Sequence, residues 1–282
     1  MRKINILPNM VTAFSLACGL FVIFKMNMLE PGSGYYGIVK GAILILFLAA
    51  AADFVDGALA RMLRAESDFG VIFDSLADAI SFCVAPAVLI LKTLSEAPGT
   101  WHSIVISSAA MIYVFCGILR LARFNLHKAK TENDLMAVIE QKKIFTGLPV
   151  PAAPAAVVSL NLLFLSPIVA YLPFRIEYVT TVISIAMILA GYLMVSRLKF
   201  PSFKRLRLRV PSFNFVFFTV CFVLFFFYGL KYYFAAVLTV VSWSYVLLAL
   251  ILSLIRMIAG RKSKTLEDFE PEPEDNEDAS EG

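Results

Sequence analysis

Long apolar stretches constrain the fold of this chain more than any other feature of its sequence. About eight of them are long enough, at roughly 18–24 residues each, to cross a membrane as a helix. They lie near residues 9–29, 37–61, 71–93, 102–123, 147–166, 177–198, 212–230 and 233–256. Hydrophobic residues make up 60% of the chain and the mean hydropathy is +0.80, which excludes an ordinary soluble domain. We therefore predict an all-α polytopic membrane protein.

The distribution of basic residues predicts how the chain is oriented. With the N-terminus in the cytoplasm, 20 of the 25 Lys and Arg side chains fall on the cytoplasmic side. The outer side keeps Lys25, Lys40, Lys92, Arg175 and Lys231. Because short cytoplasmic loops of membrane proteins are enriched in Lys and Arg, this asymmetry favours about eight transmembrane helices with both termini in the cytoplasm. We expect a multi-pass protein of the cytoplasmic membrane.

Composition divides the chain into three parts. Residues 1–200 hold the first six predicted transmembrane helices, and residues 201–264 hold a basic linker and the last two. The basic cluster in residues 197–209 either binds anionic lipid headgroups or only anchors the topology. Residues 265–282 carry nine acids and few apolar side chains, so we expect a disordered acidic tail. We expect no nucleic-acid partner.

Apart from Glu177, which begins the stretch near 177–198 and belongs to the polar connection before it, four carboxylates are the only acids that fall inside the predicted membrane helices. Asp53 and Asp56 lie one helical turn apart near the end of one helix, and Asp74 and Asp78 lie one turn apart near the start of the next. The short connection between these helices lets the four side chains converge near the cytoplasmic boundary. A carboxylate in hydrocarbon is costly, so this hairpin is the predicted functional site.

The four acids and their neighbours predict chemistry on a phosphate. Close carboxylates repel one another, and divalent cations remove the repulsion. Oxygen ligands favour Mg²⁺ or Mn²⁺, which bridge carboxylate and phosphate oxygens. Gly57 and Ala60 open a notch on the helix for a ligand, and Arg61 supplies a forked donor that suits phosphate. Alternatively, Arg61 anchors the helix at the membrane surface and Gly70 only ends the loop.

The pattern D-x2-D-G-x2-A-R-x8-G-x3-D-x3-D runs from Asp53 to Asp78, and the sequence matches every fixed position. In this pattern the chain resembles the CDP-alcohol phosphotransferase family. The resemblance implies an integral membrane enzyme with two divalent cations. Such an enzyme transfers a substituted phosphate from a CDP-linked donor to an alcohol and releases CMP. The resemblance also implies that the metal ligands are Asp53, Asp56, Asp74 and Asp78, that Asp78 is also the general base, and that Gly57 and Ala60 form the floor of the cytidine site. We expect the residues that bind CDP to be Asp53, Asp56, Gly57, Ala60, Arg61, Gly70, Asn9 and Thr12.

Three further stretches resemble one branch of that family, the CDP-diacylglycerol–serine O-phosphatidyltransferases. They are residues 7–20, residues 73–86, and residues 119–125 together with 145–151. Cys83 departs from the glycine that this branch leads us to expect. The resemblance implies CDP-diacylglycerol as the donor, L-serine as the acceptor and a homodimer. Glycerol 3-phosphate, inositol phosphate or choline as the acceptor, and an archaeal-type lipid donor, are alternatives.

Polar residues at the cytoplasmic ends of other predicted helices are candidates for substrate contacts. Asn9 and Thr12 lie one turn apart, where they can orient the phosphates of the donor or a metal-bound water; alternatively, Asn9 caps that helix. Arg120 and Arg123 also lie one turn apart. With Asn125 they offer contacts for the carboxylate of serine or for the diphosphate. The alternative is that both arginines only anchor their helix.

A transporter for a divalent metal or for protons is the alternative from another class of protein. A transport path places acids at several depths and on several helices. Here the intramembrane acids lie at one level of one hairpin. The sequence therefore favours the enzyme.

Overall fold

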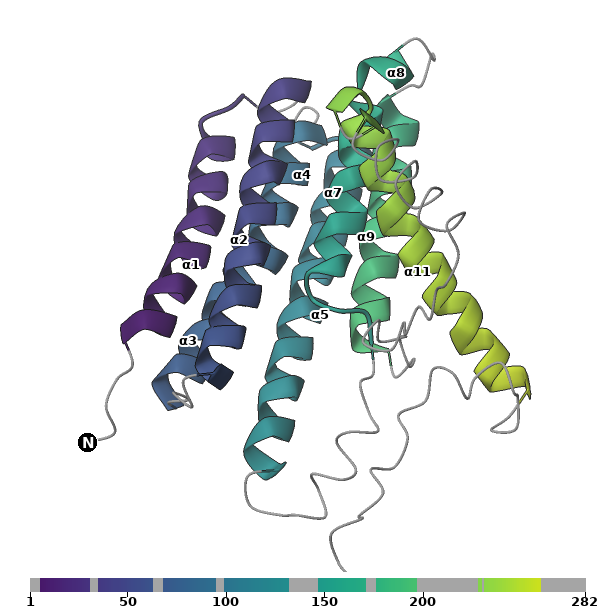
Figure 1. The fold of residues 1–282 in the computed structure, drawn as a ribbon. Helices are drawn as coiled ribbons and strands as arrows, with labels where there is room; N and C mark the ends of the chain where they lie inside the picture. Colours follow the sequence, from purple (N-terminus) through teal and green to yellow (C-terminus); the bar gives the residue numbers. More distant parts are fainter. Residues whose placement is uncertain are drawn as a thin grey trace, which may run out of the picture.

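The computed structural model of the chain describes residues 6–30, 35–62, 68–94, 99–131, 147–170, 176–196, 228–229 and 231–259. Within these ranges all regular structure is helical, which confirms the predicted all-α class (Figure 1). The helices are α1 (Ile6–Asn27), α2 (Tyr36–Met62), α3 (Asp68–Asp78), the π-helix η1 (Ala79–Val84), α4 (Ala85–Leu94), α5 (Trp101–Thr131), α7 (Ala152–Phe164), α8 (Pro167–Ala170), α9 (Ile176–Val195) and α11 (Phe234–Ala259).

Six segments of the described chain are long and apolar enough to cross a membrane. They are Asn9–Asn27, Tyr36–Leu59, Phe69–Leu94, Trp101–Leu126, Glu177–Val195 and Phe234–Ser253. The prediction of a polytopic membrane protein is confirmed. The helix predicted at 212–230, the basic cluster at 197–209 and the tail at 265–282 lie outside the described residues. The total of eight helices and the side on which the termini lie stay predictions.

The predicted helix at 147–166 is shorter in the structure, where α7 covers 13 residues. Proline has no N–H and its ring disrupts a helix interior, so Pro149 and Pro151 lie before the helix and not inside it. Pro154 falls in the first turn of α7, where the backbone N–H has no partner within the helix. By itself, α7 is too short to cross a bilayer.

The chain enters α7 against the end of α9. Gly147 has a φ of +94°, and a Cβ at this position would lie 2.6 Å from the carbonyl oxygen of Met194. The next residue, Leu148, is fully buried and its backbone N–H donates to the carbonyl of Leu193 at 3.1 Å. Only glycine fits this close approach, which joins two segments that are far apart in the sequence.

The helices pack side by side, as α1 and α2 do in Figure 1, and α4 and α7 are buried on more than one face. On α9 the buried residues Ile183, Met187, Ala190 and Met194 recur every three or four positions and share one face. The opposite surfaces of the bundle expose large apolar side chains. Phe14, Phe21 and Phe24 on α1 and Met111, Ile112, Phe115 and Ile118 on α5 are examples. An apolar outer surface of this extent is typical of a protein that is surrounded by lipid.

Candidate active site

The buried face of α2 begins apolar and ends with two acids. Val39, Leu46 and Ala49 are buried, and Asp53 and Asp56 continue the same spacing of three or four residues toward the end of the helix. Asp56 is only 4% exposed, whereas Asp53 is half-buried. The periodicity that builds the core therefore also turns both carboxylates inward.

Three carboxylates gather between α2 and α3. One carboxylate oxygen from each of Asp53, Asp56 and Asp74 lies within 4.8 Å of the other two. Asp74 comes from α3, which follows α2 at the same end of the bundle in Figure 1. Three hard oxygen donors this close together can hold a divalent cation of the Mg²⁺ or Mn²⁺ class. The donor set thus fits a metal ion.

Asp78 completes the group from the last turn of α3. Its carboxyl group contacts that of Asp53, and the charges of Asp74 and Asp56 also act on it. The four acids singled out in the sequence are therefore brought together, with Asp78 against the edge of the other three. Asp78 is the last α-helical residue before the π-helix η1.

Helix α1 contributes a hydrogen-bond donor to this group. The hydroxyl of Thr12, which is buried, donates to Oδ2 of Asp56 at 2.7 Å. One turn further on, the hydroxyl of Ser15 donates to the carbonyl of Ala49 at 3.1 Å. These two bonds fix α1 along α2 and orient one oxygen of the Asp56 carboxylate. Thr12 had been a candidate for the phosphates of the donor, and the structure places it against a carboxylate.

Asn9 lies one turn before Thr12 and is half-buried. The alternative that Asn9 caps this helix is wrong, because α1 begins at Ile6 and Asn9 already lies inside it. Gly57, next to Asp56, and Gly70, in the first turn of α3, are both half-buried. Ala60 and Arg61 lie in the last turn of α2, and their side chains are outside the part of the chain that the structure describes.

Helix α5 reaches the site through Asn125. The amide nitrogen Nδ2 of Asn125 donates to Oγ of Ser75 at 2.7 Å, and the Ser75 hydroxyl donates to the carbonyl of Val71 at 3.0 Å. Ser75 is the neighbour of Asp74, so this bond holds the helix that carries Asp74 and Asp78. Asn125 was a candidate from the sequence, whereas Ser75 was not. The only signal for Ser75 in the sequence is its position between Asp74 and Asp78.

The two arginines of α5 have different surroundings. Arg120 is half-buried near Cys83 of η1 and Tyr245 of α11, and its atom NH1 is buried with no hydrogen-bond partner in the described chain. A buried guanidinium nitrogen of this kind is suited to an anionic group. Arg123 donates from NH1 to the carbonyl of Val195, at the end of α9, at 3.5 Å. Arg120 is thus the stronger candidate for a substrate anion.

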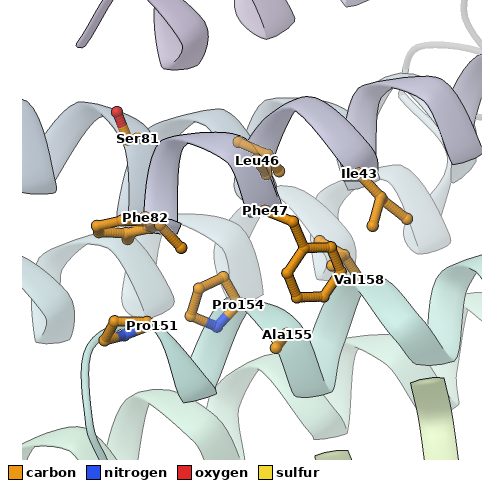
Figure 2. A pocket seen from close by; sticks show the side chains of 10 residues that line it. Ile43, Leu46, Phe47, Ser81, Phe82, Pro151, Pro154, Ala155 and Val158 are labelled. Carbon is orange, nitrogen blue, oxygen red and sulfur yellow. The ribbon is translucent and has the colours of Figure 1, made fainter. Parts of the chain in front are cut away.

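A small apolar cleft of about 30 Å³ lies between α2, η1 and α7 (Figure 2). Phe47 comes from α2, Phe82 from η1 and Pro154 from α7. Its volume matches that of about one water molecule, so it holds neither a nucleotide nor a polar headgroup. The aspartates do not line it; they lie on α2 and α3, with Thr12 of α1 and Asn125 of α5 beside them.

Comparison with known proteins gives the class to which this arrangement belongs. The profile of the CDP-alcohol phosphatidyltransferase family matches residues 5–196. The chain belongs to the CDP-alcohol phosphatidyltransferase family. The match contains α1 to α9 and all four aspartates, and α11 lies beyond it.

Several similar proteins are named CDP-diacylglycerol–serine O-phosphatidyltransferase. That of Bacillus subtilis is 34% identical over 201 residues, which are 71% of this chain and 93% of the relative. That of Methanocaldococcus jannaschii is 31% identical over 190 residues, 67% of this chain and 78% of the relative. That of Mycobacterium leprae is 37% identical over 159 residues, 56% of this chain and 47% of the relative. The chain thus spans most of two of these relatives and about half of the third.

Proposed function

We propose that this protein transfers the phosphatidyl group of CDP-diacylglycerol to the hydroxyl of L-serine, giving phosphatidylserine and CMP. The observation that carries the chemistry is the group of three carboxylates within 4.8 Å of one another, with Asp78 against Asp53. The choice of donor and acceptor is supported by the names of the relatives from Bacillus subtilis and Methanocaldococcus jannaschii.

The transfer is a displacement at phosphorus. The hydroxyl oxygen of serine forms a bond to the phosphorus that carries diacylglycerol. The bond from that phosphorus to the bridging oxygen of the diphosphate breaks, and CMP leaves with the electron pair. Asp78 takes the proton of the serine hydroxyl as general base, since a base must lie within hydrogen-bond reach of the proton it removes.

The remaining acids bind cations for this step. Asp53, Asp56 and Asp74 hold two Mg²⁺ or Mn²⁺ ions together with Asp78. When bound, these ions stabilise the negative charge of the diphosphate and of the departing CMP. Thr12 keeps the Asp56 carboxylate in its orientation through the bond at 2.7 Å. Gly57, Ala60, Arg61, Gly70 and Asn9 bind the CDP part of the donor.

Arg120 supplies the contact for the acceptor. Serine brings a carboxylate, which needs a fixed cation near the base. The buried NH1 atom of Arg120 has no partner in the described chain, and Arg120 lies near η1, which directly follows Asp78. Arg123, by its bond to the end of α9, contributes charge to the same region, and Asn125 holds α3 through Ser75.

The site faces the cytoplasm in this proposal, and the protein lies in the cytoplasmic membrane as a homodimer. The distribution of Lys and Arg supports this orientation. A cytoplasmic site also fits the substrates, because serine and CMP dissolve in water while the donor is a lipid of the same bilayer.

The experiment that tests the function is CMP release from CDP-diacylglycerol by the purified protein across a panel of alcohols. We expect turnover with L-serine and much less with glycerol 3-phosphate, inositol phosphate or choline. The Arg120→Ala variant should raise the KM of serine and change the KM of the donor less. Preference for another alcohol contradicts the choice of serine, and no CMP release with any of them contradicts the proposed chemistry.

A further inference from the structure

The third transmembrane segment changes its helical form directly after Asp78. Residues Ala79–Val84 form the π-helix η1, and the backbone N–H of Ala85 donates to the carbonyl of Ile80, five residues earlier. Before η1 the segment is α3, which carries Asp74 and Asp78, and after it the chain continues as α4. A π turn contains more residues than an α turn, so η1 rotates the two acids about the helix axis relative to α4.

Pro86 accounts for this change. In an α-helix the carbonyl of Phe82 accepts a hydrogen bond from the N–H of residue 86, and proline has none. The ring of Pro86 would also collide with that carbonyl in an α-helical turn. A wider turn before the proline relieves the collision, and the Phe82 carbonyl, which receives no bond from residue 86, can accept one from another donor.

Tyr113 of α5 supplies that donor. Its hydroxyl donates to the carbonyl oxygen of Phe82 at 3.0 Å, and its side chain is fully buried. A hydrogen bond in the interior of a membrane protein has no competing water, so the bond fixes the position of η1 against α5.

Two close packing contacts hold η1 from both sides. Toward α1, the Ser81 hydroxyl donates to the carbonyl of Ser15 at 3.1 Å, and a side chain at Gly19 would collide with Ser81. Toward α5, a side chain at Gly117 would collide with the sulfur of Cys83. Cys83, which stands where the resemblance leads us to expect glycine, thus packs against a glycine of α5, Gly117, one turn after Tyr113.

We propose that Tyr113 is a positioning residue of the active site, which acts through the Phe82 carbonyl and the π-helix to set where Asp78 and Asp74 face Asp53 and Asp56. The proposal rests on the function proposed above only in that Asp78 takes part in phosphate transfer. It assigns no contact between Tyr113 and a substrate.

The test is a double-mutant cycle with Tyr113→Phe and Pro86→Ala. Tyr113→Phe removes one oxygen and should lower kcat of CMP release by about ten- to a hundredfold, because small displacements of reacting groups have effects of this order. The KM values of both substrates should stay within about threefold, since no binding contact is removed. Pro86→Ala restores an N–H to residue 86 and removes the cause given above for the π turn, so this change alone should also lower kcat. In that background Tyr113→Phe should lower kcat by less than about threefold, because the carbonyl has another donor.

Tyr36→Phe is the matched control, because the Tyr36 hydroxyl meets the backbone of Ala235. Tyr36 begins α2, about 25 Å along the helix from Asp53, so its removal should leave kcat unchanged. A second readout needs no turnover: Mn²⁺ is titrated into the substrate-free protein while the Tm is measured. Mn²⁺ should raise the Tm of the unchanged protein and of Tyr36→Phe, and should raise that of Tyr113→Phe less.

Three results overturn the proposal. One is a Tyr113→Phe variant with normal kcat, another is an equal loss of kcat in both backgrounds, and the third is a loss that lies in KM. If Tyr113→Phe does not fold, the proposal is tested with the variant that carries both Tyr113→Phe and Pro86→Ala. A monodisperse protein whose kcat matches that of Pro86→Ala alone supports the proposal, and failure to fold or a further loss of kcat contradicts it. If the protein prefers an alcohol other than serine, only the proposed function is overturned. The kcat values of the variants and of the unchanged protein are then measured with that alcohol, and the test of Tyr113 stands.

Discussion

The α2–α3 hairpin and the surroundings of α7 place polar groups in the same apolar bundle in two different ways. In the hairpin, four carboxyl groups face one another and the Thr12 hydroxyl donates to one of them. Around α7 the groups are neutral and the donors named next meet acceptors, while Oδ1 of Asn161 is buried without a hydrogen-bond partner in the described chain. Asn161 donates to Thr93 of α4 at 2.9 Å, while Thr239 and Trp243 of α11 donate to carbonyls of α7 at 2.9 and 3.0 Å.

The difference separates function from stability. Neutral hydrogen bonds between membrane helices are worth about 1 kcal/mol each and hold the bundle together. The four gathered carboxylates differ, because their charges repel one another until a cation binds, and this repulsion opposes the bond that Thr12 makes to Asp56. We therefore expect changes in the hairpin to remove activity and changes around α7 to lower only the stability.

The largest expected effect is that of metal removal. Excess EDTA should abolish CMP release, because the carboxylates cannot approach a diphosphate without cations. Added Mg²⁺ or Mn²⁺ should restore it. The measurement is turnover before and after dialysis against the chelator, and full activity in EDTA would refute the metal site.

The second largest effect on turnover should be that of Asp78→Asn. The change keeps the shape of the side chain but removes a base, and loss of a general base lowers turnover by about a hundredfold or more. Binding of CDP-diacylglycerol to the variant should remain measurable by calorimetry. If turnover is nearly normal, the base is another residue.

Thr12→Val tests the donor that α1 provides. It removes the hydrogen bond to Asp56 at 2.7 Å, and bonds to charged groups are worth about 1.5–3 kcal/mol. We expect a fall in kcat/KM of roughly tenfold and a higher Mn²⁺ concentration for half-maximal activity. Thr12→Ser keeps the hydroxyl and should restore both values; a serine variant as poor as the valine variant would assign the effect to packing.

The smallest effect on activity should come from Asn161→Leu, in the region around α7. Asn161 is fully buried, and its amide joins α7 to α4. The Tm should fall, since a bond worth about 1 kcal/mol is lost between the two helices. The kcat should stay within about twofold, because distant sites behave independently. A large loss of kcat at unchanged Tm would remove the distinction between the two regions.

The sequence predicts the aspartate group well because its information is local. A spacing of three or four residues puts two acids on one face of a helix, and a short connection brings the next helix back beside it. The contact of Thr12 with Asp56 was not predictable in the same way. It depends on how α1 is rotated against α2, and the spacing within either helix does not contain that angle.

The π-helix and the length of α7 are two features for which the prolines in the sequence indicate a disturbed helix but do not determine its final form. Pro86, in the middle of an apolar stretch, indicates a disturbance of the helix but leaves open a kink, a break or a wider turn. In the structure the turn is wider, and the Phe82 carbonyl before Pro86 accepts a bond from Tyr113, which is 27 positions away from Pro86 in the sequence. Pro149 and Pro151 likewise indicate a late start of α7, and hydropathy alone extends the predicted helix across them.

The length of α5 sets the depth of the site in the bilayer. Its 31 residues extend for about 46 Å, while the hydrocarbon layer is about 30 Å thick. If Trp101 begins near one surface, Asn125 lies about 36 Å further on, beyond the opposite edge of the hydrocarbon. Asn125 bonds to Ser75, beside Asp74, so with this placement of α5 the reacting groups lie at the level of the lipid headgroups. A thicker bilayer would draw them into hydrocarbon, which ties turnover to the chain length of the surrounding lipids.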